Sequence, residues 1–398
     1  MARILMSCVP AYGLANPTFP FARALVAAGH HVDYLIPSSF RRAVERTGAT
    51  HLPYADYLDG PIVRPDQLVR HGRRLFRDQD AELLARGRDY DAVVAGGMNP
   101  RIPELEHALD RPVIFLSPVF FQHDQVIRHL AGLADALPAP ARRVFADRRL
   151  RRPVMGVVGA AMGWGRDFDV VAMMGPRSST LNISPASRYY QPCDHLFGDR
   201  CLFAGPTPTL AASDDSFPID RLRDHDGPVI YGTLGTVFNS WTPFFRTLAA
   251  AFAGSNALLV LTTGNARRLR EVGPMPANVV ISDFVPQTEV LRHADLCFTH
   301  GGFGSATDTV AMGVPAIFTP MGADQFFNAY RIQELDAGRV LPKRDFTPAN
   351  ARRLADEVLQ TPPAGLPRLR RSFLDAPGPA AAVTAIEEVI AGRSPTLP

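Results

Sequence analysis

Cysteine is scarce in this chain. Its 398 residues include only Cys8, Cys193, Cys201 and Cys297, and no two of them have Cys-x-x-Cys spacing. That spacing is typical of zinc and redox motifs, so we expect neither chemistry. A chain of this length can bury sizeable cores without disulfides. We therefore expect free thiols in a cytoplasmic protein.

Long apolar runs and an excess of one charge are also missing. No stretch approaches the roughly 18 apolar residues of a membrane-spanning helix, and residues 1–6 lack the long apolar region of a secretory signal. Lys and Arg number 42 against 39 Asp and Glu, which gives a net charge of +3. We expect no membrane span and no nucleic-acid partner.

Two common nucleotide-binding motifs are absent. The first turn of the chain has the sequence Gly13-Leu14-Ala15-Asn16-Pro17-Thr18, which lacks the Gly-x-Gly-x-x-Gly pattern of nicotinamide-binding folds. The chain also has no Walker A sequence. These absences disfavour a dehydrogenase with its cofactor at this turn and a P-loop nucleotidase.

What the chain does have is an alternation of strands and helices. The first 36 residues predict a βαβ unit. An apolar run at 3–9 is followed by turn residues with Pro17, by a helical pattern that Gly29 ends, and by a second apolar run at 31–36. Such a unit implies a parallel sheet with a right-handed crossover. Further strands are expected at 91–95, 113–116, 228–234, 257–261, 279–281, 296–299 and 316–318.

These patterns predict an α/β protein with two Rossmann-like domains facing a central cleft. The first domain should span residues 1–204, and a stretch rich in Pro, Ser and Asp at 205–225 is the expected linker. The second domain should span 226–378, and 379–398 should form a last helix and tail. Residues 120–174 are expected to be mostly helical, either lining a ligand pocket or packing ordinarily.

A cluster of polar residues and glycines in the second array carries the chemistry. A glycine turn between a strand and a helix offers free N–H groups to a diphosphate, and His300 is placed to donate to a phosphate oxygen. Carboxylates and amides farther along suit ribose and sugar hydroxyls, and an aromatic ring suits a nucleobase. In chain order the residues are Phe284, Gln287, His300, Gly302, Ser305, Asp308, Asp324, Gln325 and Asn328.

This stretch resembles the donor-binding signature of the two-domain (GT-B) nucleotide-sugar-dependent glycosyltransferases, which include plant, macrolide and glucuronosyl transferases. Phe284 stands for the usual Trp and Asp308 for the usual Glu. The strand and turn at 231–236 resemble the opening of the family's second domain, which would bring Gly235 and Thr236 to the diphosphate. The sequences at 16–17 and 29–32 resemble those of the bacterial macrolide subgroup of this family.

The resemblance implies an inverting transferase that uses a UDP- or dTDP-sugar as co-substrate, with no cofactor and no metal. The first domain would bind the acceptor, a small, apolar molecule of polyketide-like or aromatic type. A homodimer is an assembly compatible with this expectation. The apolar middle of the first domain fits such an acceptor.

The usual catalytic pair of this family is not at its expected positions. The His of the first turn is replaced by Leu14, and the Asp that ends a strand near residue 96 is replaced by Gly96-Gly97. His123 and Asp124, which follow an expected strand, are the substitute catalytic residues that we predict. The alternative is that no protein base is used, because the acceptor ionises easily, as a phenol or an acidic enol does.

Two other function classes remain open. One is a nucleotide-sugar epimerase on the same scaffold, which would need acid and base groups at the sugar. The other is a non-catalytic homologue that binds nucleotide or assists a partner transferase. The donor residues argue against this second class, and the altered catalytic pair argues for it.

Overall fold

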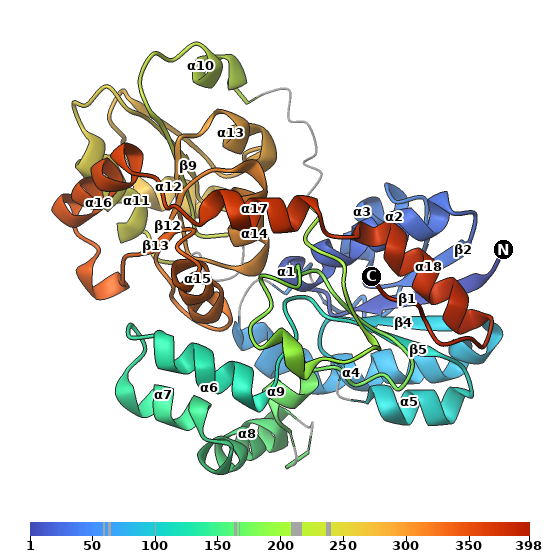
Figure 1. Cartoon of the computed structure of the whole chain (residues 1–398). Helices are drawn as coiled ribbons and strands as arrows, with labels where there is room; N and C mark the ends of the chain where they lie inside the picture. Colours follow the sequence, from blue (N-terminus) through green and yellow to red (C-terminus); the bar gives the residue numbers. More distant parts are fainter. Residues whose placement is uncertain are drawn as a thin grey trace. The chain divides into compact units, whose positions relative to one another are not determined.

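A computed structural model describes residues 1–58, 60–62, 65–99, 101–162, 165–166, 168–207, 217–235 and 240–398. The chain divides into two compact units, each built on its own sheet (Figure 1). Unit 1 holds Met1–Gly132, Pro138–Thr207 and Asp375–Pro398, and unit 2 holds Leu133–Leu137 and Pro208–Leu374.

Unit 1 contains a parallel seven-stranded sheet with the order β3-β2-β1-β4-β5-β6-β7. The chain starts in the middle of this sheet and moves outward in both directions, as in other doubly wound folds. The strands are β1 (Arg3–Cys8), β2 (His31–Leu35), β3 (Thr50–Leu52), β4 (Ala92–Gly96), β5 (Val113–Leu116), β6 (Asn182–Ser184) and β7 (Cys201–Phe203).

Unit 2 contains a parallel six-stranded sheet with the order β10-β9-β8-β11-β12-β13. The two parallel sheets confirm the predicted α/β class. The strands are β8 (Val229–Thr233), β9 (Leu258–Thr262), β10 (Val279–Ser282), β11 (Leu296–Thr299), β12 (Ala316–Phe318) and β13 (Arg339–Val340).

Helices cover both faces of the first sheet, with α2, α3 and α18 on one side and α4 and α5 on the other (Figure 1). The region after β5 is helical, as predicted. The helices are α1 (Tyr12–Ala15), α2 (Phe19–Ala27), α3 (Arg41–Glu45), α4 (Pro65–Arg86), α5 (Ile102–Leu109), α6 (Asp124–Leu133), α7 (Ala139–Ala146), α8 (Arg148–Met162), α9 (Val170–Met173) and α18 (Gly378–Ile390).

The helices of unit 2 flank its sheet in the same way. They are α10 (Ile219–Arg223), α11 (Pro243–Phe252), α12 (Ala266–Val272), α13 (Gln287–His293), α14 (Phe303–Met312), α15 (Gln325–Glu334), α16 (Pro348–Gln360) and α17 (Leu366–Leu374). Short 3₁₀ segments occur at Asn16–Thr18, Ser38–Phe40, Gly87–Asp89, Asp194–Leu196 and Lys343–Asp345.

The first βα connection is more helical than the sequence predicts. Residues 12–17 have the composition of a turn, yet α1 occupies Tyr12–Ala15 and a 3₁₀ segment follows at once. Ala11 is extended and begins the helix, and Pro17 lies in the first turn of the 3₁₀ segment, where its missing N–H costs nothing. The connection is therefore a short helical segment that leads directly into α2.

The last helix returns to the first unit. After α17 the chain leaves unit 2, and α18 packs against α2 (Figure 1). Its buried side chains, including Ile386, join the core that Phe21 and Leu25 of α2 form with the sheet. His30 links both ends of the chain, because its Nδ1 accepts from the Ala2 N–H and its Nε2 lies 3.0 Å from Glu387 Oε1.

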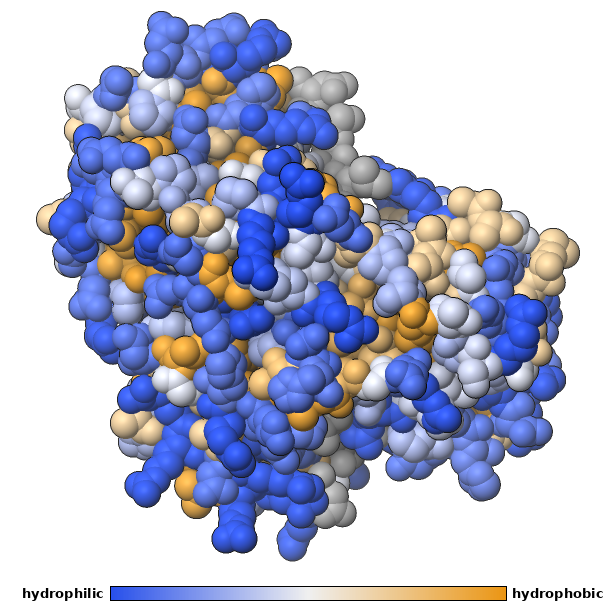
Figure 2. Space-filling view, viewed as in Figure 1, coloured by the Kyte–Doolittle hydropathy of each residue, from blue (hydrophilic) through white to orange (hydrophobic). Residues whose placement is uncertain are grey.

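The expected linker at 205–225 is described only in part. Residues 208–216 lie outside the described residues, while Phe217 is buried and α10 belongs to unit 2. The face shown in Figure 2 is mostly polar, and its apolar residues form separate patches. Within the described parts of the chain, every helix is too short or too polar to cross a bilayer.

The packing of α18 predicts the effect of trimming one of its side chains. Ile386→Ala should lower the free energy of unfolding of unit 1 by about 2–5 kcal/mol, because a fully buried side chain is replaced by a cavity. Leu374→Ala, at a side chain that is 63% exposed, should change the free energy by less than about 0.5 kcal/mol. Urea denaturation measures both, and equal stabilities would show that α18 is not docked.

Candidate functional site

The carboxyl ends of two neighbouring strands in unit 2 bring the predicted residues together. Strands β8 and β11 pair in parallel, with Thr233 opposite Thr299. The loops that follow therefore leave the sheet side by side, one carrying Gly235 and the other His300. In open parallel sheets this edge is where ligands bind.

The His300 imidazole is enclosed by two residues without side chains. A Cβ atom on Gly235 would lie 2.6 Å from the ring Cε1, and one on Gly302 would lie 2.6 Å from Nε2. Gly235 also has φ +63°, in the left-handed region. A Cβ at either position would therefore force the imidazole to move.

The protonation state of His300 follows from its burial. The residue is 7% exposed, and burial lowers the pKa of the imidazole to about 4. The ring is neutral near pH 7. Thr299 Oγ1 lies 3.3 Å from Nδ1. When this hydroxyl donates to Nδ1, the ring proton is on Nε2 and can be donated to an anionic oxygen.

Helix α14 begins next to this ring. Gly301 has φ +84° and Gly302 is the N-cap residue, which offers no side chain to the first-turn N–H groups. Ser305 is half-buried in that first turn. The positive end of the helix dipole at this turn suits an anion such as a diphosphate.

Asp324 and Asn328 hold the backbone of this turn. Asn328 donates from Nδ2 to the Gly301 carbonyl oxygen at 3.1 Å and to Asp324 Oδ2 at 2.8 Å. Burial raises the pKa of the Asp324 carboxyl, and the hydrogen bonds from Asn328 and from the N–H of Phe303 oppose that rise. The carboxylate therefore helps to fix the start of α14.

Gln325 shapes the loop before α15. Its side chain is buried, and Oε1 accepts hydrogen bonds from the N–H groups of Met321 at 2.9 Å and Gly322 at 3.1 Å. The amide oxygen is thus engaged with the backbone, so Gln325 positions this loop.

Half-buried Gln287 and buried Asp308 form a pair next to the same edge. Gln287 donates from Nε2 to Asp308 Oδ2 at 2.7 Å and accepts at Oε1 from the Tyr231 hydroxyl at 3.3 Å. Asp308 is 3% exposed. Phe284 differs, since its ring is 54% exposed and offers a free face for stacking. Thr236 lies outside the described residues.

In unit 1, the two positions of the usual catalytic pair lie next to each other. A Cβ on Gly97 would lie 3.2 Å from Cys8 Sγ and 3.8 Å from Leu14 Cβ. Burial raises the pKa of Cys8 to about 12, so its thiol stays protonated. Leu14 and Gly97 themselves have no side chain that can take up a proton, and the neighbouring Cys8 thiol does not replace one near neutral pH.

The predicted substitutes, His123 and Asp124, are already engaged in other contacts. His123 is exposed, and its Nδ1 accepts from the Gln125 N–H at 3.2 Å. Asp124 accepts from Arg151, a fully buried guanidinium that also donates to Asp169 at 3.1 Å. These contacts give Asp124 a clear role in joining α6 to α8.

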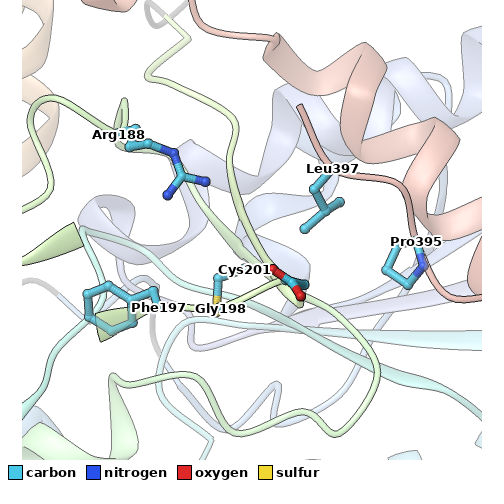
Figure 3. Close-up of a pocket in the computed structure, with 7 residues that line it drawn as sticks. Arg188, Phe197, Gly198, Cys201, Pro395 and Leu397 are labelled. Carbon is cyan, nitrogen blue, oxygen red and sulfur yellow. The ribbon is translucent and has the colours of Figure 1, made fainter. Parts of the chain in front are cut away.

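The sequence did not indicate two features of the structure. One is the role of Asn328 as the tie between Gly301 and Asp324. The other is a cavity of about 310 Å³ in unit 1, between the region around β7 and the C-terminal tail. The side chains of Arg188 and Leu397 line it from different sides (Figure 3). Its lining residues include Cys201 and Asp199 and none of the predicted site residues.

Comparison with known proteins gives consistent results. Residues 247–389 match the model of the erythromycin biosynthesis protein CIII-like C-terminal domain. The chain is 30% identical over 416 residues to demethyllactenocin mycarosyltransferase of Streptomyces fradiae, with 98% of this chain and 87% of that protein covered. It is 28% identical over 405 residues to uncharacterized UDP-glucosyltransferase YdhE of Bacillus subtilis (strain 168), with 98% and 99% covered.

Among solved structures, the calicheamicin glycosyltransferase CalG4 is similar over the whole chain. The TM-score is 0.71 at 24% identity, with 99% of each chain covered. This similarity shows that the fold is shared.

The two glycines around His300 predict the effect of a single methyl group. Gly302→Ala should weaken binding of a nucleoside diphosphate at least about tenfold, because the new Cβ displaces the imidazole. Gly304→Ala is the matched control, since a Cβ there meets nothing within 4 Å. Calorimetry with UDP and dTDP measures both. Wild-type affinity of Gly302→Ala would contradict the described packing of His300.

Burial of His300 also predicts a pH dependence of stability. The pKa of the folded state, about 4, is below the ordinary 6.5 of an unfolded histidine. The unfolded chain therefore binds a proton first as the pH falls, and stability decreases from about pH 6.5 downward. Between pH 6.5 and 5, the free energy of unfolding should fall less in His300→Gln than in the wild type. Equal losses in urea denaturation would refute a neutral buried ring.

Proposed function

The chain belongs to the bacterial natural-product glycosyltransferases of the two-domain (GT-B) type, and from this premise we propose that it transfers a sugar from a nucleoside diphosphate to a small acceptor with inversion at the anomeric carbon. The observation that carries the proposal is the placement of the His300 imidazole. Its Nε2 edge lies against Gly235 and Gly302, at the start of α14.

The donor would bind at the carboxyl edge of the unit 2 sheet. The diphosphate would accept hydrogen bonds from His300 Nε2 and from N–H groups of the first turn of α14, including that of Ser305. The exposed ring of Phe284 would stack on the nucleobase. Asp308, held by Gln287, would face the ribose, and Asp324 with Gln325 would face the sugar. Gly235 and Thr236 would approach the diphosphate from the loop after β8.

A UDP- or dTDP-sugar is the donor class that we propose. The name of YdhE, a UDP-glucosyltransferase, supports a uridine donor for one relative of this chain. The name of the Streptomyces relative, a mycarosyltransferase that acts on demethyllactenocin, supports a polyketide-like acceptor. Unit 1 would bind this acceptor.

The chemistry expected of this site is leaving-group stabilisation. As the acceptor oxygen bonds to the anomeric carbon, the bond to the diphosphate breaks and negative charge develops on its oxygens. A neutral imidazole that donates from Nε2 and a fixed helix N-terminus are preorganised to meet that charge. Both lie in unit 2 and are held in place before the donor arrives.

An epimerase on the same scaffold is the second candidate, and a non-catalytic homologue is the third. The steric enclosure of His300 and the ordered turn at Gly301 support donor binding in all three cases. The three differ in what happens to the bound donor. An assay must therefore follow the donor, its epimer, and the glycosylated acceptor together.

The assay uses a panel of UDP- and dTDP-sugars with polyketide and phenolic acceptors, with and without EDTA. We expect transfer that EDTA leaves unchanged, and a His300→Ala variant that is slower by about a hundredfold, the cost of losing one charge-stabilising donor. Calorimetry should show weaker diphosphate binding in the same variant. Undiminished turnover and affinity in His300→Ala would overturn the donor site, and donor epimerisation without transfer would favour the second candidate.

A further inference from the structure

A buried polar cluster lies at the carboxyl end of the unit 1 sheet. Gln79 and Asp80 belong to α4, and Ser7 lies at the end of β1. Asn99 follows β4, the strand that pairs with β1 through Cys8 and Gly96. Gln79 is 2% exposed, Asp80 6% and Asn99 2%. This is the same sheet edge at which Leu14 and Gly97 meet.

Hydrogen bonds hold the cluster together without using all of its acceptors. Gln79 donates from Nε2 to Ser7 Oγ at 2.6 Å. Asn99 donates to Asp80 Oδ1 at 3.5 Å, and Arg101 donates to Oδ2 at 3.4 Å. Both bonds to the carboxylate are long, so its oxygens retain lone pairs for another donor.

Two polar atoms of this region are buried without a partner among the described residues. They are Gln79 Oε1 and the hydroxyl oxygen of Tyr54. Buried polar groups are nearly always hydrogen-bonded in folded proteins, so both atoms are placed to accept a hydrogen bond from a bound molecule. Gln79 Oε1 can only accept a hydrogen bond, which requires an O–H or N–H donor on the ligand.

The surroundings of Asp80 suit a base. Burial raises the pKa of the carboxyl, and Glu104 adds to that rise, while Arg101 and Asn99 oppose it. The pKa of the Tyr54 phenol is raised, first by burial and then by Cys8 and Tyr57. The charge of Asp80 adds to this rise, so Asp80 lies near Tyr54. A carboxylate with a raised pKa takes up a proton more readily near neutral pH.

We propose that Asp80 is the catalytic base and that Gln79 Oε1 orients the acceptor, whose reacting group is a hydroxyl. This inference rests on the proposed glycosyl transfer. The acceptor proton moves to a carboxylate oxygen of Asp80 as the acceptor oxygen bonds to the anomeric carbon. The bond from that carbon to the diphosphate breaks, and the diphosphate leaves with the electron pair. The half-exposed Arg101 marks the side from which solvent can remove the proton.

The fold gives a reason for this assignment. Leu14 and Gly97 put only apolar atoms at the positions of the usual catalytic pair, so a base at this edge must come from another element. Helix α4 passes the ends of β1 and β4 and brings Asp80 to Asn99, in the loop that contains Gly97. His123 is a weaker alternative, because its Nδ1 already accepts from a backbone N–H.

The test is Asp80→Asn, a nearly isosteric change, with Glu82→Gln as the matched control. Glu82 lies on the same helix and pairs with Arg86 at 2.7 Å. For an alkyl hydroxyl acceptor, kcat of Asp80→Asn should fall by roughly 10² to 10⁴, and the acidic limb of the pH profile should vanish. For a nitrophenol, which ionises by itself, the loss should be below tenfold. Nucleoside diphosphate affinity should be unchanged, and Glu82→Gln should stay within twofold of the wild type.

The following results would overturn the assignment. A wild-type kcat and pH profile in Asp80→Asn removes Asp80 as the base, and loss of the acidic limb in His123→Ala instead assigns the base to His123. If Asp80→Asn does not fold, Asp80→Glu should keep the acidic limb with kcat at least tenfold lower, and an unchanged kcat refutes the proposal. If the wild type transfers no sugar with any donor, the proposed function fails, and this assignment fails with it.

Discussion

The steric enclosure of the His300 ring is the constraint on which the proposed donor site in unit 2 depends. The imidazole lies against the backbone that leads into the first turn of α14. That approach leaves no room for a Cβ at Gly235 or Gly302. Gly235 and Gly301 also have left-handed backbone conformations, which glycine adopts without steric cost. The rest of the site follows from keeping this turn in place.

The polar residues of the signature stabilise that turn through contacts with one another. Asn328 joins the Gly301 carbonyl to Asp324, and Gln325 binds the backbone of the preceding loop. Gln287 similarly holds Asp308. A buried network of this kind is rigid, because any broken bond would leave an unpaired polar group. The proposed donor site is therefore largely formed in advance, which favours leaving-group stabilisation without rearrangement.

The sequence was sufficient to predict features that depend on residues close together along the chain. Buried apolar runs such as that of β8 predict strands, and a glycine turn between a strand and a helix predicts the start of α14. The sequence could not specify partners that are far apart along the chain. The amphipathic pattern of α18 predicts a helix but does not indicate that Ile386 packs in the core of unit 1. Likewise, Asp124 follows a strand as a catalytic residue would, but its partner Arg151 is a matter of tertiary structure.

The same limit explains why the sequence did not single out Asp80, the base that we propose. It lies within a helix rich in charged residues, where its carboxylate looks like one more solvated group. Only the fold shows that Gln79 and Asp80 face inward at the ends of β1 and β4, while Glu82 pairs with Arg86 at the surface. In unit 2 the polar groups come mainly from loops and helix starts that directly follow strands, and their pattern in the sequence is therefore compact. In unit 1 a long helix supplies them, and a charged residue in a helix has no distinctive pattern until its neighbours are known.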